Sequence, residues 1–411
     1  MVVSFMTTTL RGHSGFCVTR LFALQRRPGL SGHPRLRLFA SHPKGCTRVL
    51  PERGSPLAMT QKTPAYGARA AKAPVAPMTI ERRDPGPHDV EIEILYCGIC
   101  HSDVHMVNDD WGNTQFPVVP GHEIVGRVVS QGARASRYRE GDLVGVGCFV
   151  DSCRACAQCR AGHEMFCEKG ATFTFDSLEQ DQKARTYGGY SARMVVDERY
   201  VLRVPKRLDP SRAAPLMCAG ITTYSPLRQF GCKPGDQVAV MGLGGVGHMA
   251  VKLAKSMGAD VTVLSTSPGK EEAAARLGAE SFVATKEPGA LDPLAGKFDL
   301  IVDTISAPHD LDKHLALLRS FGTMVLLGLP PDATSPASIK AGSLVFGNKR
   351  LAGSNIGGIP ETQEMLDHCG KHGIVADVEI IRGDQINVAY KRMLQGDVRY
   401  RFVIDCASIG A

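Results

Sequence analysis

The sequence predicts an α/β protein in which a doubly wound parallel sheet domain accompanies a second, β-rich domain. Apolar strand and helix patterns alternate across residues 219–354, which is typical of a parallel sheet with helices on both faces. Residues 59–218 instead hold short β-branched runs separated by Gly and Pro. At 411 residues the chain is also too long for one ordinary core, so two domains are expected.

The elements follow from local patterns. In the β-rich part, strands are predicted for the β-branched runs at 90–95, 123–129 and 142–150. In the second part, apolar runs predict strands at 238–243, 261–267, 298–304 and 323–329. Between them, helical patterns occupy 248–258, 271–279 and 311–322. Two more helices, at 361–373 and 386–396, and a last strand, at 400–405, complete the chain.

Composition and charge exclude several classes of protein. The chain is 43% apolar and 22% charged, and it has no run of the roughly 18 apolar residues that a membrane-spanning helix needs. The formal charge of +7 is concentrated in residues 1–58, where nine Lys or Arg accompany a single acid, Glu52. The remainder is nearly neutral and offers no basic surface for nucleic acid. We therefore expect neither a membrane nor a nucleic-acid partner.

Four cysteines share one short run, 151–167, with the spacing C-x2-C-x2-C-x7-C. They are Cys153, Cys156, Cys159 and Cys167. Four thiolates at this spacing suit one tetrahedral zinc ion and leave no open position for a substrate. The lobe at 148–170 is therefore expected to be structural. A disulfide knot or an iron–sulfur ligand set can have the same spacing and stays an alternative.

Three further motifs accompany this lobe. They are YCGICHSDVH (96–105), PGHEIVG (120–126) and PLMCAGITTY (215–224), and the last is followed by VAVMGLGGVGHMA (238–250). In this combination and order, the chain from about Tyr66 to about Ile404 resembles the zinc-dependent medium-chain dehydrogenase/reductase family. It looks most like the cinnamyl alcohol dehydrogenase branch, and within that branch like bacterial NADP-dependent aldehyde reductases of broad specificity.

The resemblance implies a Rossmann cofactor-binding domain over 219–354 and a discontinuous, GroES-like catalytic domain over 59–218 and 355–411. It implies hydride transfer between NADP(H) and a broad range of primary alcohols and aldehydes, mainly as NADPH-dependent aldehyde reduction. A cinnamyl- or mannitol-type alcohol dehydrogenase that works oxidatively is the alternative. A non-enzymatic zinc-binding or redox-sensing protein is disfavoured, because the whole set of motifs is retained in one chain.

The resemblance also assigns a catalytic zinc to three residues and places two acids behind them: Cys100, His122 and Cys218, then Glu123 and Asp103. Two thiolates and one imidazole leave a fourth position open for substrate. Asp103 would fix which nitrogen of His122 faces the ion. A lone histidine in PGHE is more often a packing residue, so the prediction depends on all three segments together. Cys97 and Cys148 are expected to be small buried apolar residues instead.

A dinucleotide site is predicted at GLGGVG because this string follows an apolar strand and opens a helix. Gly242 allows the tight turn, Gly244 lets the pyrophosphate approach the backbone, and Gly247 lets the helix pack on the strand. Taken alone, the string is also compatible with a simple helix–sheet packing turn. The expected cofactor contacts here are Gly242, Leu243, Gly244, Gly245, Val246 and Gly247.

The choice between NAD and NADP is made about 20 residues further on, where an acid would bind the ribose 2′-OH. Here the strand ends in hydroxyl side chains, Ser265, Thr266 and Ser267, with Lys270 beyond. No carboxylate is present to repel a phosphate, and hydroxyls and an ammonium group would bind one. The pattern resembles the NADP site of the branch, although Pro268 and Gly269 leave the position of Lys270 open. We expect NADP(H).

The segment after Cys100 is expected to carry the proton. By resemblance, Ser102 hands a proton to the substrate oxygen, His105 relays it from solvent, and His101 contacts the pyrophosphate. Ser102 is otherwise a turn hydroxyl and His105 an exposed helix residue. Trp111, the single tryptophan, resembles a wall of the substrate pocket, and a packing role for its loop is the alternative. An apolar pocket discriminates weakly between aldehydes.

Residues 1–58 are rich in Arg, bear Ser and nearly lack acids, which is the composition of an organelle transit peptide. A start codon placed too far upstream is the other explanation, because Met59 stands directly before the region where the first strand of the family begins. We favour this explanation and expect 1–58 to be disordered or not translated. The expected location is then the cytoplasm, where 13 cysteines stay reduced. Organelle targeting is the alternative.

The assembly is predicted from two segments, 324–329 and 344–358, which resemble those by which the family joins two cofactor domains edge to edge. A homodimer, or a tetramer made of such dimers, is expected. The small molecules expected to bind are two zinc ions per chain, NADP(H), and an aldehyde or alcohol substrate.

Overall fold

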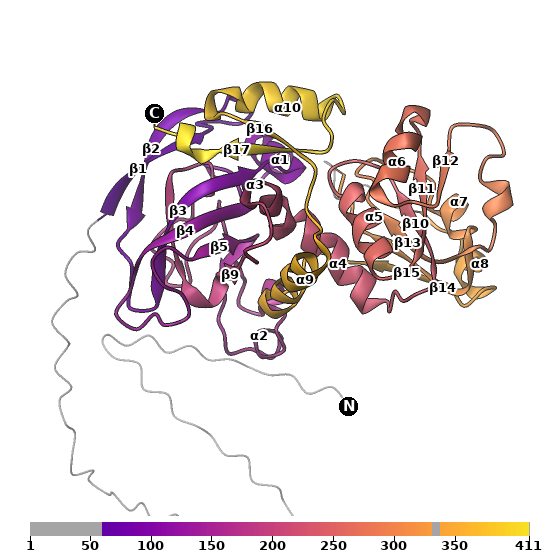
Figure 1. The fold of residues 1–411 in the computed structure, drawn as a ribbon, viewed down its shortest axis with the longest axis horizontal. Helices are drawn as coiled ribbons and strands as arrows, with labels where there is room; N and C mark the ends of the chain where they lie inside the picture. The colour runs from indigo at the N-terminus through magenta and orange to yellow at the C-terminus, as the bar shows by residue number, and fades with distance from the viewer. Residues whose placement is uncertain (1–59, 331–337, 411) are drawn as a thin grey trace, which may run out of the picture. The chain divides into compact units, whose positions relative to one another are not determined.

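The computed structural model describes residues 60–330 and 338–410, and Figure 1 shows their arrangement. The predictions for residues 1–58 lie outside the described residues. Within the described ranges, no helix has both the length and the apolar character needed to cross a membrane.

A six-stranded sheet forms the core of the predicted cofactor-binding part. Its strands, in spatial order, are β12 (Ser281–Ala284), β11 (Asp260–Ser265), β10 (Gln237–Met241), β13 (Phe298–Asp303), β14 (Leu318–Leu326) and β15 (Arg350–Gly353). Every neighbouring pair is parallel. The chain starts in the middle at β10, moves outward to β12, and returns to fill the other half. This order is that of a dinucleotide-binding sheet, so the predicted doubly wound domain is confirmed.

The two faces of this sheet pack on different helices. The helices are α5 (Gly247–Ser256), α6 (Glu271–Leu277), α7 (Leu311–Leu315) and α8 (Ala341–Val345). Val240 on β10 belongs to a buried cluster with Val251 of α5. Its neighbour Met241 belongs to a second cluster with Leu315 of α7. Because successive strand residues point to opposite faces, the two clusters lie on the two sides of the sheet.

One predicted element was wrong in its second half. The helical pattern at 311–322 predicts a single helix, but α7 ends at Leu315 and β14 begins at Leu318, which pairs with Phe298 of β13. The register between β13 and β14 shifts just after this pair. Leu318 is almost fully buried, so an apolar run that could join a helix instead extends the sheet. Tertiary pairing overrides local helix propensity here.

The catalytic part is built around a seven-stranded sheet. Its main path is β16 (Val378–Ile381), β17 (Arg401–Asp405), β3 (Asp89–Gly98), β4 (Ile124–Gln131), β5 (Leu143–Val146) and β9 (Leu202–Arg203), and β8 (Arg193–Asp197) pairs with β3. Two small sheets pair β1 (Thr60–Gly67) with β2 (Ala76–Arg83), and β6 (Phe149–Asp151) with β7 (Thr172–Phe173). The remaining α-helices are α1 (His101–Asn108), α2 (Ala157–Arg160), α3 (Pro210–Ala213), α4 (Ala219–Gln229), α9 (Ile359–His372) and α10 (Ile386–Leu394).

The catalytic part is discontinuous in sequence, as predicted. β17, near the C-terminus, pairs antiparallel with β3, so that Val403 lies opposite Gly98. The chain after α9 therefore returns to the seven-stranded sheet, as the yellow β17 beside the indigo β3 shows in Figure 1. Helix α4 contacts both α5 and α9, and one buried apolar cluster includes residues of both sheets. The predicted domain boundaries at 218/219 and 354/355 stay predictions.

Candidate active site

Three potential metal ligands from distant segments converge in the catalytic part. Cys100, His122 and Cys218, together with Glu123, each offer a ligand atom within 4.8 Å of all the others. Sulfur and nitrogen ligands on a tetrahedral zinc ion, with bonds of about 2.0–2.3 Å, lie about 3.3–3.8 Å apart, so the cluster suits one such ion. Cys100 and His122 are buried, and Cys218 is partly exposed. The sequence therefore predicted correctly which residues meet.

Asp103 organises the two segments that carry Cys100 and His122. Cys100 is the N-cap of α1, and its backbone N–H donates to Asp103 Oδ2 at 2.8 Å. The N–H of Gly121 donates to Asp103 Oδ1 at 3.0 Å, and the hydroxyl of Tyr190 donates to Oδ2 at 3.1 Å. The carboxylate is completely buried and accepts from all three groups. It thereby holds the loop before His122 against the start of α1.

The imidazole of His122 is oriented by the same carboxylate. Its Nδ1 lies 3.2 Å from Asp103 Oδ1, which leaves Nε2 as the nitrogen free to face the cysteines. Phe175 stacks on the ring with centroids 5.8 Å apart. Hydrogen bonds from Cys218 and His122 lower the pKa of the Cys100 thiol well below its usual range. Because the thiolate is the form that binds metals, this arrangement favours metal binding at Cys100.

Glu123 has a partner that sequence reasoning missed. Its side chain is fully buried and pairs with the guanidinium of Arg401, which is 3% exposed. Burial raises the pKa of Glu123 to about 7, against the opposing effect of Arg401. The second carboxylate oxygen of Glu123 has no hydrogen-bond partner among the described residues. A single arginine at the start of the apolar strand RFVID was the only available signal for Arg401.

Arg401 also approaches the glycine-rich loop. A Cβ added to Gly245 would lie 2.8 Å from its Cδ and 2.9 Å from its Nη1. The same guanidinium therefore contacts the carboxylate beside the metal ligands and borders the loop predicted to bind pyrophosphate. A cation at this place would complement the negative charge of a dinucleotide.

The two cysteines predicted to be buried and apolar differ from each other. Cys97 is fully buried, as expected, and burial raises the pKa of its thiol. Cys148 is only partly buried; its Sγ lies 3.9 Å from Met217 O, and the residue packs against the main apolar cluster. Cys148 is thus less buried than predicted, and neither cysteine belongs to the group of four possible ligands.

The predicted relay residues follow Cys100 on α1. The Ser102 hydroxyl lies 3.7 Å from Cys100 Sγ, directly beside the ligand set. His105 is buried, and its Nδ1 lies 2.8 Å from Asp110 Oδ2. The exposed helix position considered for His105 is therefore wrong. Trp111 packs on the His105 ring with centroids 5.2 Å apart, and its indole N–H is buried without a partner in the described part of the chain.

His101 differs from its neighbours on α1 because its side chain is exposed. Its ring lies 6.4 Å from that of His105. The contact with pyrophosphate that we expect for His101 stays a prediction.

The four-cysteine lobe also converges on one point. Its ligand atoms lie within 4.8 Å of one another, with Sγ–Sγ distances of 3.4 Å between Cys156 and Cys159 and 3.9 Å between Cys153 and Cys159. In a tetrahedral Zn–S₄ unit the sulfurs are about 3.8 Å apart. The Cys153 N–H donates to Cys167 Sγ, and the Cys156 N–H donates to Cys153 Sγ. All four are free cysteines, so the disulfide alternative does not describe this structure.

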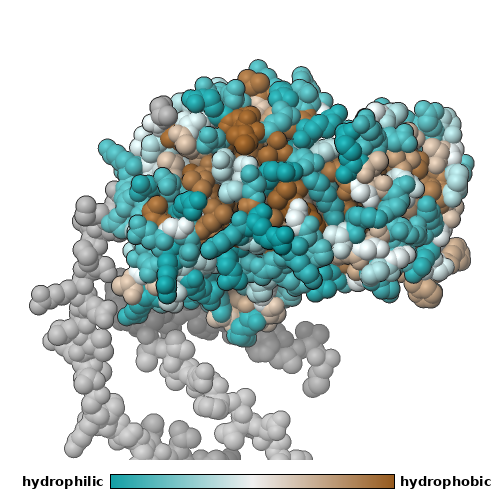
Figure 2. Space-filling view, in the orientation of Figure 1, coloured by the Kyte–Doolittle hydropathy of each residue, from teal (hydrophilic) through white to brown (hydrophobic). Residues whose placement is uncertain are grey.

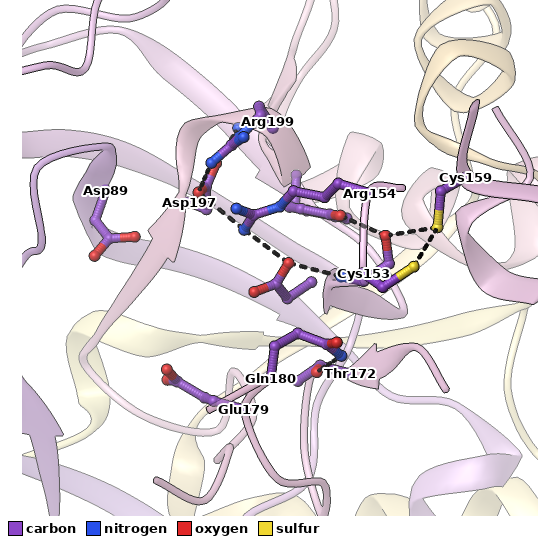
Figure 3. A network of polar contacts seen from close by, with 12 residues as sticks. Asp89, Cys153, Arg154, Cys159, Thr172, Glu179, Gln180, Asp197 and Arg199 are labelled. Atoms are coloured by element: carbon purple, nitrogen blue, oxygen red, sulfur yellow. Dashed lines mark hydrogen bonds and ion pairs between the residues drawn. The ribbon is translucent and has the colours of Figure 1, made fainter. Parts of the chain in front are cut away.

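The lobe is fastened to the catalytic sheet by the polar network in Figure 3. Arg154, between the first two cysteines, donates to Asp151 at 2.7 Å and pairs with Asp197 of β8 at 3.0 Å. The backbone of Arg154 has φ of +60°, a conformation that residues other than glycine rarely adopt. Ser152 links Cys159 Sγ, at 3.1 Å, to the hydroxyl of Tyr200, at 2.7 Å.

The glycine-rich loop has the expected shape. Gly242 follows β10 with φ of +85°, and Gly247 opens α5. A Cβ at Gly247 would lie 2.0 Å from Gly242 O, so only glycine fits there. Gly244 is exposed and would meet nothing within 4 Å, which leaves room for a ligand at the N-terminal end of α5. Leu243 is buried, so it can contact a cofactor only through its backbone.

The hydroxyl cluster after β11 is less uniform than predicted. Thr266 and Ser267 are exposed, whereas Ser265 is buried and its Oγ accepts a bond from the Ser267 N–H at 3.2 Å. Lys270 lies beside the glycine-rich loop, and its Nζ donates to Leu243 O at 2.9 Å. Burial, and then the nearby Arg399, lowers the pKa of Lys270. A cation and two free hydroxyls therefore lie beside the loop.

A cavity of about 1420 Å³ opens at the C-terminal ends of β13, β14 and β15. Its walls include Ile305 and Leu327, which follow β13 and β14, Phe166 of the four-cysteine lobe, and Glu361 of α9. Ligands of doubly wound sheets bind outside the carboxyl ends of the strands, where this cavity lies. Its lining does not include the metal-ligand cluster.

Comparison with known proteins gives the same picture. The chain matches the model of the alcohol dehydrogenase GroES-like domain over residues 86–206 and that of the zinc-binding dehydrogenase domain over 245–371. It is 54% identical to aldehyde reductase YahK of Escherichia coli, over 84% of this chain and 98% of that protein. It is also 54% identical to NADP-dependent alcohol dehydrogenase C of Mycobacterium tuberculosis, over 84% and 99% of the respective chains.

Solved structures agree in fold. A cinnamyl alcohol dehydrogenase from Sorghum bicolor superposes with a TM-score of 0.82 at 44% identity, covering 84% of this chain and 98% of its own. A second one, from Helicobacter pylori in complex with NADP(H), superposes with a TM-score of 0.80 at 39% identity, covering 85% and 99%. This chain therefore belongs to the zinc-binding alcohol dehydrogenase family.

Proposed function

We propose that this chain is a zinc-dependent alcohol dehydrogenase that mainly reduces aldehydes with NADPH. The observation that carries the proposal is the convergence of Cys100, His122 and Cys218 on one point, in a chain that also folds a glycine-rich loop at the start of α5. Relatives of more than half identical sequence are named aldehyde reductase and NADP-dependent alcohol dehydrogenase. Both the ligand set and the loop fit the groups that such a reaction needs.

The residues divide the work of the reaction between them. Cys100, His122 and Cys218 would hold a catalytic zinc ion, and the four-cysteine lobe would hold a structural one. When bound, the catalytic zinc supplies Lewis-acid polarisation of the aldehyde oxygen, and NADPH supplies the hydride. Asp103 keeps the His122 ring in the orientation that presents Nε2. Glu123 and Arg401 bring one negative and one positive charge beside the ligands.

A proton must reach the substrate oxygen as hydride reaches the carbon. Ser102 would donate it from Oγ, and the 3.7 Å between this hydroxyl and Cys100 Sγ supports that role. His105 follows one helical turn later and is paired with Asp110, so it can return a proton to the serine through a bridging hydroxyl or water. Trp111 packs on His105 and would form one side of the substrate site.

NADPH preference is supported by the absence of a carboxylate at the end of β11. Thr266 and Ser267 are exposed there, and Lys270 lies half-buried beside them. These groups suit a 2′-phosphate, whereas NAD sites usually carry an acid at this place. The cavity at the carboxyl ends of β13 and β14 is large enough for part of a bound dinucleotide.

The most direct test combines metal analysis with turnover. Purified enzyme should contain two zinc ions per chain and should reduce a panel of aromatic and aliphatic aldehydes faster with NADPH than with NADH. Rates with NADPH plus benzaldehyde should exceed those with NADP plus benzyl alcohol. A higher kcat/KM with NADH, or a protein with no zinc at Cys100, His122 and Cys218, would contradict the proposal.

We also propose a homodimer formed through the open edge of the six-stranded sheet. β15 is the last strand of the sheet, and Val345 and Phe346 beside it are 67% and 93% exposed. Figure 2 shows apolar surface at the end where α8 and β14 lie. A second copy would cover these side chains and pair the edge. Light scattering of the protein and of Phe346→Asp would show a dimer and its dissociation, respectively.

The cellular location we propose is the cytoplasm, because thiolate zinc ligands need a reducing compartment. We also propose that the catalytic domain comprises 59–218 and 355–411 and the cofactor domain 219–354. Limited proteolysis that cuts near these boundaries would support the assignment.

A further inference from the structure

A histidine that the proposed mechanism does not use lies directly behind the glycine-rich loop. His248 is the second residue of α5 and is completely buried. Its ring stacks on Tyr400 with centroids 4.9 Å apart and planes inclined by 14°. Both of its ring nitrogens have backbone partners, so its role goes beyond packing.

These partners fix the protonation state of the ring. Gly245 O lies 2.9 Å from Nδ1, and a carbonyl oxygen can only accept, so Nδ1–H donates to it. The Asp377 N–H donates to Nε2, at 3.3 Å, so Nε2 carries no proton. Burial, followed by Lys252 and Arg401, lowers the pKa of His248 to about 3. The ring is therefore neutral at ordinary pH and has a single tautomer.

The bond to Gly245 sets the orientation of a peptide group in the loop. In a planar trans peptide the C=O and the following N–H point in opposite directions. Because His248 holds Gly245 O on its own side, the N–H of Val246 is directed to the other side. Val246 is the N-cap of α5, where free N–H groups bind the pyrophosphate of a dinucleotide.

The bond from Asp377 connects this peptide to the rest of the site. Asp377 O accepts from the N–H groups of Tyr400 and Arg401, at 2.9 and 3.1 Å, while its side chain pairs with Lys252 of α5 at 2.8 Å. Arg401 in turn pairs with Glu123 beside the metal ligands. A continuous set of contacts thus leads from the loop through His248 and Asp377 to the catalytic sheet.

We propose that His248 is a positioning residue for the dinucleotide, which fixes the Gly245–Val246 peptide so that Val246 N–H points at the pyrophosphate. This inference rests on the proposed function, because it assumes that the loop binds NADPH. It assigns the two ring nitrogens different tasks. Nδ1 orients the loop, and Nε2 ties the loop to the segment that carries Arg401.

Two amide variants separate these tasks. In His248→Asn, the side-chain amide lies near the place of Nδ1 and can still donate to Gly245 O. In His248→Gln, the amide reaches the place of Nε2 and can accept from Asp377 N–H but no longer holds Gly245 O. Both variants lose the stacking on Tyr400, so they are matched for packing. NADPH affinity is measured for the zinc-loaded enzyme by fluorescence titration, together with the melting temperature of the cofactor-free protein.

We expect His248→Gln to weaken NADPH binding about tenfold, the effect of one lost hydrogen bond to a buried carbonyl, and His248→Asn to stay within about threefold of wild type. The matched control is the same pair of changes at His314, a buried histidine of α7 whose Nδ1 donates to Asp310 O at 2.7 Å. Neither His314 variant should change NADPH affinity.

Equal affinities in the two His248 variants, whether both are weakened or both unchanged, would overturn the inference, since a packing role would affect both alike. A wild-type enzyme that does not bind NADPH would overturn the proposed function and the inference together. The tautomer gives an independent readout in the cofactor-free protein. In ¹⁵N NMR of histidine-labelled enzyme, a ring signal with a protonated Nδ1 and a bare Nε2 should persist from pH 5 to 9 and be missing in both His248 variants, but remain in the His314 variants.

Discussion

Arg401 and Glu123, which are 278 positions apart, form an ion pair that solvent does not reach. Arg401 lies on β17 of the catalytic sheet, and its guanidinium also borders Gly245 of the glycine-rich loop. The pair therefore lies where the metal ligands, the returning C-terminal strand and the predicted pyrophosphate site meet. Water solvates neither charge, so each charge is stabilised mainly by the other.

Loss of Arg401 alone should be much worse than loss of the pair. Arg401→Met leaves a buried carboxylate without its cation, which costs about 3–5 kcal/mol of stability. The double variant with Glu123→Gln removes both charges and should recover much of this loss. Melting temperatures at one scan rate, with zinc content measured in parallel, test the difference. Equal melting temperatures for the single and double variants would show that the pair does not act as a unit.

Replacement of Ser102 should separate metal binding from proton transfer. Ser102→Ala removes the hydroxyl next to Cys100 Sγ but no predicted ligand, so zinc content should stay at two per chain. The kcat for aldehyde reduction should fall about a hundredfold or more, because a positioned proton donor is lost. Ser130→Ala on β4, which removes a hydroxyl bonded to Glu91 of β3, is the control and should leave kcat unchanged. An unchanged kcat in Ser102→Ala would remove this residue from the mechanism.

The ion pairs of Arg154 should determine how firmly the structural zinc is held. Arg154→Gly keeps the backbone conformation at φ of +60° without strain but removes the pairs with Asp151 and Asp197. Arg154→Ala removes the same pairs and adds the strain of a Cβ in that conformation. We expect zinc release to a chromogenic chelator to be faster in both variants, and fastest in Arg154→Ala. Arg160→Ala, on the exposed helix α2, is the control.

Release of zinc at the wild-type rate from both Arg154 variants would mean that the cysteines hold the lobe without help from the sheet. Turnover is not the measure here, since the lobe has no open position for substrate.

The sequence predicted features that depend on neighbours in the chain. The glycine string, the C-x2-C-x2-C spacing and the strand–helix alternation are local patterns with specific physical demands, and the structure places them as expected. Long-range pairing was not accessible in this way. Nothing near Arg401 in the sequence indicates that it meets Glu123, and nothing near Asp377 indicates that it meets His248.

The missed strand at 318–322 has the same cause. The run ALLRSFG carries apolar residues at both helical and strand spacing, so local periodicity could not decide between them. The pairing of Leu318 with Phe298 of β13 decided it.

A histidine at the cavity gives the protein a pH-dependent stability. His309 Nε2 lies 2.8 Å from the buried Asp303 carboxylate, and its Nδ1 lies 2.9 Å from Ala307 O. Both partners can only accept, so both nitrogens donate and the ring is cationic. The hydrogen bond to Asp303 raises the pKa of His309. Its stabilisation is therefore fully present below the unfolded-state pKa of about 6.5 and is lost as pH rises through the folded-state pKa.

The difference in melting temperature between wild type and His309→Gln should accordingly be larger at pH 6 than at pH 9. A matched change, His372→Gln on α9, should give a difference that varies less with pH. If the gap between wild type and His309→Gln is the same at both pH values, the imidazolium pair with Asp303 contributes nothing to stability.

Cofactor preference should respond to a single charge at the end of β11. Thr266 is exposed directly after this strand, within reach of the place expected for the 2′-phosphate. A carboxylate in Thr266→Asp would repel a phosphate that carries about −1.5 to −2 charges, and would accept a bond from a ribose hydroxyl instead. We expect kcat/KM with NADPH to fall at least about tenfold, while that with NADH stays level or rises. Thr266→Asn, whose side chain matches that of the aspartate variant in size but is uncharged, should retain NADPH preference. A parallel loss with both cofactors would mean that Thr266 supports the fold of this turn and does not read the phosphate.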